Sequence, residues 1–235
     1  MIDDSELRDL DPFDLLDAEA RRVDGFFASL HDEDWLRPTR CEGWRRQEML
    51  AHLLASEEYN QATIDHTVPA LIERATAAGA EGIDGFNAWG VRRLAGRPRD
   101  ELLAEWRAAN ATTRRGLREL SWDGTLGTFV GPYPAGLQAF HLAMELAIHA
   151  DDMSVPVAGG ERQLRGTWQV RFARFTLREY GREVTVEVDG DSNLVRGAGE
   201  EQVLDDERLV DACSARLPAD YPMSQSLRDL LRVFA

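Results

Sequence analysis

The segment from Ala139 to Ala150 is apolar except at three positions, which hold His141, Glu145 and His149. A spacing of four residues places these side chains one above another on the same face of a helix. Imidazole nitrogens and carboxylate oxygens are common ligands of Zn²⁺ and related cations. This stripe is therefore the first candidate for a reactive site in the chain.

Two arrangements explain a carboxylate between two histidines in an apolar helix, because an uncompensated buried charge is costly. The side chains either hold a metal ion or form a metal-free His–Glu–His hydrogen-bond network in the core. The spacing differs from the H-E-x-x-H pattern of zinc proteases, so it predicts no protease. The residues alone leave both arrangements open.

A further histidine comes from a second apolar segment, MLAHLLA at residues 49–55, in which His52 is the only polar residue. Metal sites in helix bundles are built from side chains of facing helices that project inward. His52 is therefore the expected partner of the first segment. His31, in the acidic stretch HDED, and His66, near a helix end, are expected at the surface.

The elements that carry these residues are predicted mainly as helices, from apolar positions at helical spacing. The helix around Glu145 has no wide polar face, which predicts burial on most sides. Pro69 is expected to bend or end the second helix, and residues 121–136 are expected to form a structured connection. The predicted helices cover residues 12–30, 45 to beyond 59, 86–94, 98–120 and 135–153, with a loop over 77–85.

The sequence changes character near residue 158. Valines that alternate with other residues predict a strand over 183–191. We therefore expect a mainly α protein, with a helix bundle over residues 1–158 and a small α+β domain over residues 159–235. The helices predicted in the second part cover residues 167–180, 204–217 and 224–234.

The composition excludes several classes of function. The 235 residues carry a net charge of −15, so nucleic acid and anionic membrane surfaces repel the chain. No apolar run approaches the roughly 18 residues of a membrane span, and the acidic start has no signal-peptide pattern, so we expect a cytoplasmic protein. All 27 basic residues are arginine, which excludes lysine Schiff-base chemistry and a P-loop lysine.

The two cysteines, Cys41 and Cys213, lie far apart and belong to no C-x-x-C pair. A disulfide framework or a zinc site built from cysteines is therefore not expected. The oligomeric state is open, since no coiled-coil seam is present.

Two motifs resemble those of the DinB-like, mycothiol-dependent maleylpyruvate isomerase family. One is W-x-x-P-T-x-C-x-G-W followed by a helix with A-H-L, and the other is E-x-x-x-H-x-x-D. The resemblance covers about the first 155 residues well and the rest only in outline. The motif residues are Trp35, Pro38, Thr39, Cys41, Gly43, Trp44, Ala51, His52, Leu53, Glu145, His149 and Asp152, and Gly131 and Pro132 also fit.

The resemblance implies a DinB-like four-helix bundle that holds a divalent metal, with zinc the first choice and nickel the second. The implied ligands are His52, Glu145 and His149. Three protein ligands leave an open position, which in this family is thought to receive a low-molecular-weight thiol such as mycothiol. A metal-bound thiol is deprotonated and can attack an electrophilic carbon.

These properties lead to the hypothesis of a metal-dependent enzyme that uses the thiol to isomerise a small electrophilic molecule, or that joins the thiol to this molecule through its sulfur. His141 is the candidate proton donor or acceptor, and Asp152 is a candidate to orient a ligand imidazole. An arginine is expected to neutralise an acidic substrate, although no single arginine is marked.

Other residues of the motifs have structural interpretations. Cys41 is expected to be a small buried residue, Trp35 and Trp44 are expected in the core or a pocket wall, and Tyr133 is expected to border the pocket. Two further hypotheses remain for the chain as a whole. One is a non-catalytic structural or regulatory module stapled by a metal, and the other is a metal-free fold with a buried His–Glu network.

Overall fold

The computed structural model describes residues 3–234. It is mainly helical, with small antiparallel sheets, and divides into two compact units. One unit is Pro12–Val155, and the other joins the residues up to Asp11 to those from Pro156 onward. Within the described residues, no helix combines the length and the apolar character needed to cross a membrane.

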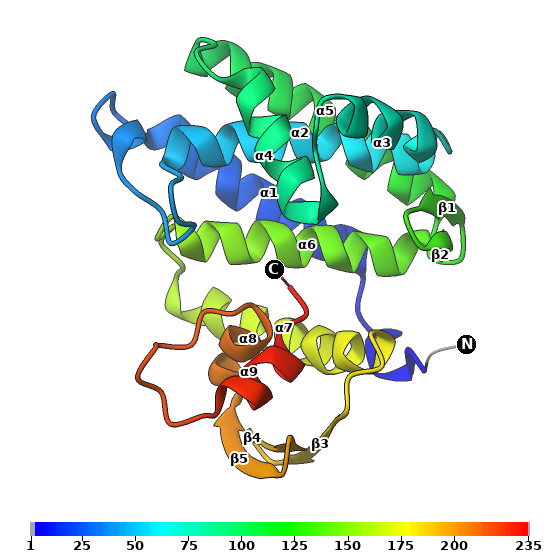
Figure 1. The fold of residues 1–235 in the computed structure, drawn as a ribbon, viewed down its shortest axis with the longest axis vertical. Coiled ribbons are helices and arrows are strands. Elements are labelled where there is room, and N and C mark those ends of the chain that lie inside the picture. Colours follow the sequence, from blue (N-terminus) through cyan, green and yellow to red (C-terminus); the bar gives the residue numbers. More distant parts are fainter. Residues whose placement is uncertain (1–2, 235) are drawn as a thin grey trace. The chain divides into compact units, whose positions relative to one another are not determined.

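The first unit is the predicted four-helix bundle (Figure 1). Helix α1 packs against α6 and α5, and α2 packs against α5. Two shorter helices, α3 and α4, pack on α2. The bounds are α1 Pro12–Ser29, α2 Arg46–Ile64, α3 Val68–Ala77, α4 Gly82–Leu94, α5 Arg99–Leu120 and α6 Ala135–Asp152.

Helix α6 is buried on nearly all sides, as its sequence predicts. Of its 18 residues, 14 are buried. The four that keep partial exposure are Asp151 and the three polar residues of the stripe, His141, Glu145 and His149. The apolar rows therefore lie in the core, and the stripe lies on the edge of this helix that keeps partial exposure.

Two predictions in the bundle need correction. Pro69 does not bend α2, which has already ended at Ile64; it lies in the first turn of α3, where a missing N–H costs nothing. The predicted loop is also shorter, because α4 begins at Gly82.

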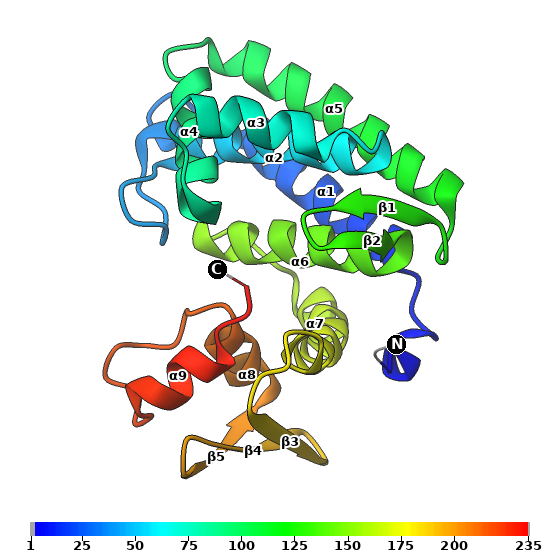
Figure 2. The same cartoon turned by 45° about the vertical axis from the view of Figure 1, so that its right-hand side comes forward.

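Residues 121–136 contain a β-hairpin that no pattern in the sequence predicts. Its strands are β1, Thr125–Thr128, and β2, Gly131–Pro134, with Leu126 opposite Tyr133. Prolines at two of the four positions of β2 argue against a strand, but a two-stranded ribbon consists of edges, where proline is tolerated. Figure 2 shows the hairpin beside the start of α6.

The second unit contains α7, Gly159–Glu179, and a three-stranded antiparallel sheet in the order β3-β4-β5. The predicted strand over 183–191 is confirmed as β3, whereas helix α7 begins eight residues before the predicted start. Leu204 lies in a strand and not in the predicted helix. The other bounds are β3 Val184–Asp189, β4 Ser192–Gly197, β5 Glu200–Asp205, α8 Asp206–Cys213 and α9 Gln225–Leu231.

The 3₁₀ turn η1, Ser5–Leu7, is held by three arginines on one face of α7. Arg174 and Arg178 pair with Glu6, and Arg171 pairs with Asp9 and donates to the Glu6 carbonyl. This contact makes the N-terminal segment part of the second unit. The division of the chain into separate domains at residue 158 stays a prediction.

Candidate metal centre

Three of the residues proposed from the sequence meet in the bundle. His52 Nε2, from α2, lies 3.2 Å from His149 Nε2 and 3.4 Å from Glu145 Oε1, both from α6. These three donor atoms lie within 4.8 Å of one another. The histidine of the first motif and the Glu–His pair of the second therefore converge on one point between two helices.

The separations fit a small divalent cation. Zinc bonds of 2.0–2.1 Å in tetrahedral geometry place neighbouring ligand atoms about 3.3 Å apart. The observed 3.2 and 3.4 Å are close to this edge length. Ligand imidazoles usually donate their second nitrogen to a polar group, but among the described residues His52 Nδ1 has no such partner. The Trp44 ring, 4.9 Å from the His52 ring between centroids, packs against it instead.

The three side chains of the cluster differ in the direction in which their pKa values shift. Burial lowers the pKa of His52, which therefore stays neutral near pH 7. Burial alone would raise the pKa of Glu145, but its hydrogen bond with His52 and the positive charge of His149 lower it. Burial opposes the charge of His149 too, yet the hydrogen bond to Asp152, the contact with Cys41 and the Glu145 charge raise its pKa to about 9. Near pH 7 the metal-free cluster therefore carries one proton that a bound metal would have to displace, and this proton lies on His149.

Asp152 lies behind the cluster, in the position expected of a group that orients a ligand. Its Oδ2 is 3.1 Å from His149 Nδ1, the ring nitrogen that points away from His52. Asp152 itself is only 2% exposed. A carboxylate in this position fixes the tautomer of an imidazole and leaves Nε2 as the free donor atom.

The first motif folds into a tight loop between Pro38 and Arg45, which form an isolated β-bridge. The Thr39 hydroxyl donates to the Trp44 carbonyl over 3.0 Å, and Gly43 takes a φ of +78° that other residues rarely adopt. Cys41, expected to be buried, is instead partly exposed, with Sγ 3.2 Å from Asp152 Oδ2. The motif thus shapes a loop that reaches the end of α6.

Arg46 is a buried residue at this end of the bundle, and no sequence pattern singles it out. Its Nη2 donates to the Met153 carbonyl over 3.1 Å, and its guanidinium lies over the Phe26 ring. Burial lowers the pKa of Arg46. In the sequence it is one of two adjacent arginines at a helix start, a pattern that usually marks a solvated surface.

His141 lies outside the donor cluster but on the same stripe of α6, one turn before Glu145. Its Nε2 is 3.1 Å from the hydroxyl of Tyr133 on β2. The hairpin that carries Tyr133 is held at its turn, where Phe129 stacks on Tyr59 of α2 with ring centroids 4.6 Å apart. The hairpin therefore positions a phenol against the imidazole that the sequence suggested as a proton carrier. His31 and His66 are exposed, as predicted.

A second buried carboxylate, Glu57, lies near the cluster and was not identified from the sequence. Its neighbour Ser56 donates to Glu145 Oε1 over 3.1 Å, whereas Glu57 faces α5. Asn110 and Thr113 donate to Glu57 over 2.8 and 2.6 Å. Burial raises the pKa of Glu57 above its ordinary value, although these hydrogen bonds oppose the shift.

Replacing Glu57 by glutamine is expected to remove a pH-dependent loss of stability. A carboxyl whose pKa is raised by folding stabilises the fold below its unfolded pKa and loses that contribution as the pH rises through the folded value. The stability of Glu57→Gln relative to the wild type should therefore increase between pH 5 and pH 8. Urea unfolding at both pH values measures it, with exposed Glu119→Gln as the control. A constant difference would contradict the prediction.

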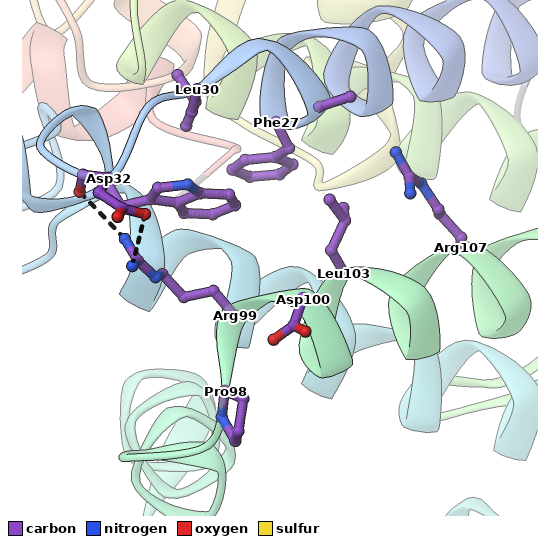
Figure 3. Close-up of a pocket in the computed structure, with 10 residues that line it drawn as sticks. Phe27, Leu30, Asp32, Pro98, Arg99, Asp100, Leu103 and Arg107 are labelled. Atoms are coloured by element: carbon purple, nitrogen blue, oxygen red, sulfur yellow. Dashed lines mark hydrogen bonds and ion pairs between the residues drawn. The ribbon is translucent and has the colours of Figure 1, made fainter.

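Two cavities of the bundle lie away from this cluster. One, of about 550 Å³, lies between the end of α1 and the start of α5 (Figure 3). Among its charged groups, Arg99 donates twice to Asp32, and Arg107 pairs with Asp24. A second cavity of similar size shares Arg99 with it. Neither is lined by His52, Glu145 or His149, so the candidate chemistry does not depend on them.

A known protein family matches more than half of the chain. The family model described as the mycothiol maleylpyruvate isomerase N-terminal domain matches residues 16–154, a span that includes all three donors. Among curated protein sequences, none matches the chain significantly.

Two solved structures share the fold. One is the crystal structure of the mycothiol-dependent maleylpyruvate isomerase, 17% identical, with a TM-score of 0.63 over 91% of this chain and 92% of that chain. The other is a mutant of that enzyme with a histidine replaced by alanine, at the same identity and TM-score over 89% and 91%. At this identity the likeness is one of fold, and it extends beyond the bundle.

Proposed function

Because the chain belongs to the family of the mycothiol maleylpyruvate isomerase N-terminal domain, we propose that it is a metal-dependent enzyme that uses a low-molecular-weight thiol. The substrate is a small electrophilic molecule, which the enzyme isomerises or joins to the thiol. The observation that carries the proposal is the meeting of His52, Glu145 and His149 donor atoms from two helices within 4.8 Å. Mycothiol, in the names of the relatives, is the first thiol to test.

His52, Glu145 and His149 are the proposed ligands of the metal, and two imidazoles with one carboxylate suit zinc first and nickel second. A divalent metal held there supplies positive charge that keeps a thiol ionised, and therefore nucleophilic, at neutral pH. Asp152 holds the His149 ring so that its Nε2 faces this point. The Trp44 ring covers one side of His52 and limits the access of water.

His141 is the proposed proton carrier, and Tyr133 holds its ring. Addition of sulfur to a conjugated double bond moves the π electrons toward the carbonyl of the substrate. If His141 then delivers a proton to the carbon beside that carbonyl, the sulfur adduct is the product. If it withholds the proton, the sulfur leaves after bond rotation, and the isomer forms. Whether the substrate carbon receives this proton therefore decides between transfer of the thiol and isomerisation.

The test is to incubate zinc-loaded protein with mycothiol and maleylpyruvate, the compound in the names of the relatives. We expect thiol-dependent loss of the cis isomer in the ultraviolet spectrum, and mass spectrometry reveals any adduct. Replacing His141 by alanine should lower kcat for adduct formation, the route that uses its proton, about 10²- to 10⁴-fold and leave the zinc content unchanged. Zinc-loaded protein without turnover of this or other conjugated acids would support a non-catalytic module stapled by metal.

A further inference from the structure

We propose that Cys41 is a positioning residue for the ligand His149 and that it acts through Asp152. This inference rests on the proposed metal site. Oδ2 of Asp152 lies 3.1 Å from His149 Nδ1 and 3.2 Å from Cys41 Sγ, so one oxygen accepts from both groups. The thiol and the imidazole are themselves 4.0 Å apart. The three side chains therefore form a chain of contacts that ends at the ring whose other nitrogen faces His52.

These contacts matter because the carboxylate of Asp152 that accepts them is buried. The side chain of Asp152 is fully buried, and a buried carboxylate is costly unless donors satisfy it. A donated S–H bond from Cys41 fixes the rotation of the carboxylate. The carboxylate in turn fixes the direction of the His149 Nδ1–H bond, and hence the direction in which Nε2 points. Without the thiol the carboxylate can rotate or admit water, and the imidazole loses its fixed orientation.

The backbone around Cys41 is arranged to hold the thiol at this place. The Cys41 N–H donates to the Thr39 hydroxyl over 3.1 Å. The Arg40 N–H donates to the main-chain carbonyl of Asp152 over 3.1 Å. The loop is therefore bound to Asp152 twice, once through its backbone and once through the thiol. This double attachment distinguishes Cys41 from a cysteine that only fills space.

The experiment measures the affinity for Zn²⁺ by competition with a chromophoric chelator, for the full-length wild type, Cys41→Ala and Cys41→Ser. We expect alanine to weaken binding about 10- to 100-fold, the usual cost of losing an outer-shell partner. Serine, which keeps a donor, should restore the affinity to within about threefold of the wild type. Cys213→Ala, which removes the other thiol, is the matched control and should bind zinc as the wild type does.

A double-mutant cycle separates positioning from general damage to the fold. In an Asp152→Asn background, the effect of Cys41→Ala should largely vanish, because both changes break one chain of contacts. Melting temperatures of the metal-free variants report any change in the fold itself.

Three results would overturn the inference. Wild-type affinity in Cys41→Ala would show that the thiol positions nothing. Equal losses in the alanine and serine variants would mean that sulfur itself binds the metal. No zinc binding by the wild type would overturn the proposed function as well, and this distinguishes the two failures.

Discussion

Replacing His52 by alanine is expected to lower the affinity for Zn²⁺ by at least about a thousandfold, well beyond the 10- to 100-fold cost of losing an outer-shell partner. His52 is the only donor of the cluster that comes from α2. Without it Glu145 and His149 remain, both from one helix, and two ligands do not define a site. The cluster would also lose the imidazole whose hydrogen bond helps to hold down the pKa of Glu145.

Elemental mass spectrometry of protein purified without chelator, together with chelator competition, measures this loss. His31→Ala removes an exposed histidine outside the cluster and is the matched control. Melting of the metal-free proteins reports the cavity left by the buried ring. Full metal content in His52→Ala would overturn the site. The absence of metal from the wild type, even after zinc and nickel are added, would instead favour the metal-free His–Glu network.

Raising the pH from 6 to 9 is expected to strengthen zinc binding roughly a thousandfold, at about tenfold per pH unit. Metal binding requires a neutral imidazole, yet the pKa of His149 is raised to about 9 in the metal-free protein. One proton must therefore leave His149 whenever the metal binds below that pH. The lowered pKa of His52 means that its ring is already neutral and releases none.

Calorimetry in buffers of different ionisation enthalpy counts the released proton, which should be close to one per zinc at pH 7. Asp152→Asn is the matched variant, because it removes the hydrogen bond that contributes most to raising the pKa of His149. In that variant the increase of affinity with pH should end at a lower pH. An affinity that stays flat between pH 7 and pH 9 in the wild type would show that His149 is neutral there.

The same pKa has a consequence for the metal-free fold. A histidine whose pKa is raised by folding contributes stability that is complete below its unfolded pKa of about 6.5. That contribution is lost as the pH rises through the folded value of about 9. Alkaline pH therefore weakens the metal-free protein while it favours the metal-bound one.

Much of the candidate site could be predicted from the sequence because its residues stand in apolar surroundings. His52, Glu145 and His149 each interrupt a run of buried residues, and a polar group at such a place needs a partner. The regular spacing in α6 then predicts a common face. The same reasoning identified the helices of the bundle, whose apolar positions repeat at helical spacing.

The functional and buried residues that the sequence does not reveal are not polar residues in apolar surroundings. Arg46 and Glu57 each stand beside another residue of the same charge, a pattern typical of a solvated face, and only the packing of the bundle buries them. The β1–β2 hairpin was missed because Pro132 and Pro134 resemble loop residues. Strand β4 was missed because its buried Asn193, which donates to the Leu204 carbonyl and to Asp206, reads as a turn residue.

The pairing of η1 with α7 determines when each part of the chain can fold during synthesis. Residues 12–155 leave the ribosome as one continuous stretch and hold every helix of the bundle. The second unit is discontinuous, so Glu6 and Asp9 are synthesised before the bundle but can pair with Arg171, Arg174 and Arg178 only after it. Since domains generally fold as units while the chain grows, the bundle can complete its core before Glu6 and Asp9 find their partners.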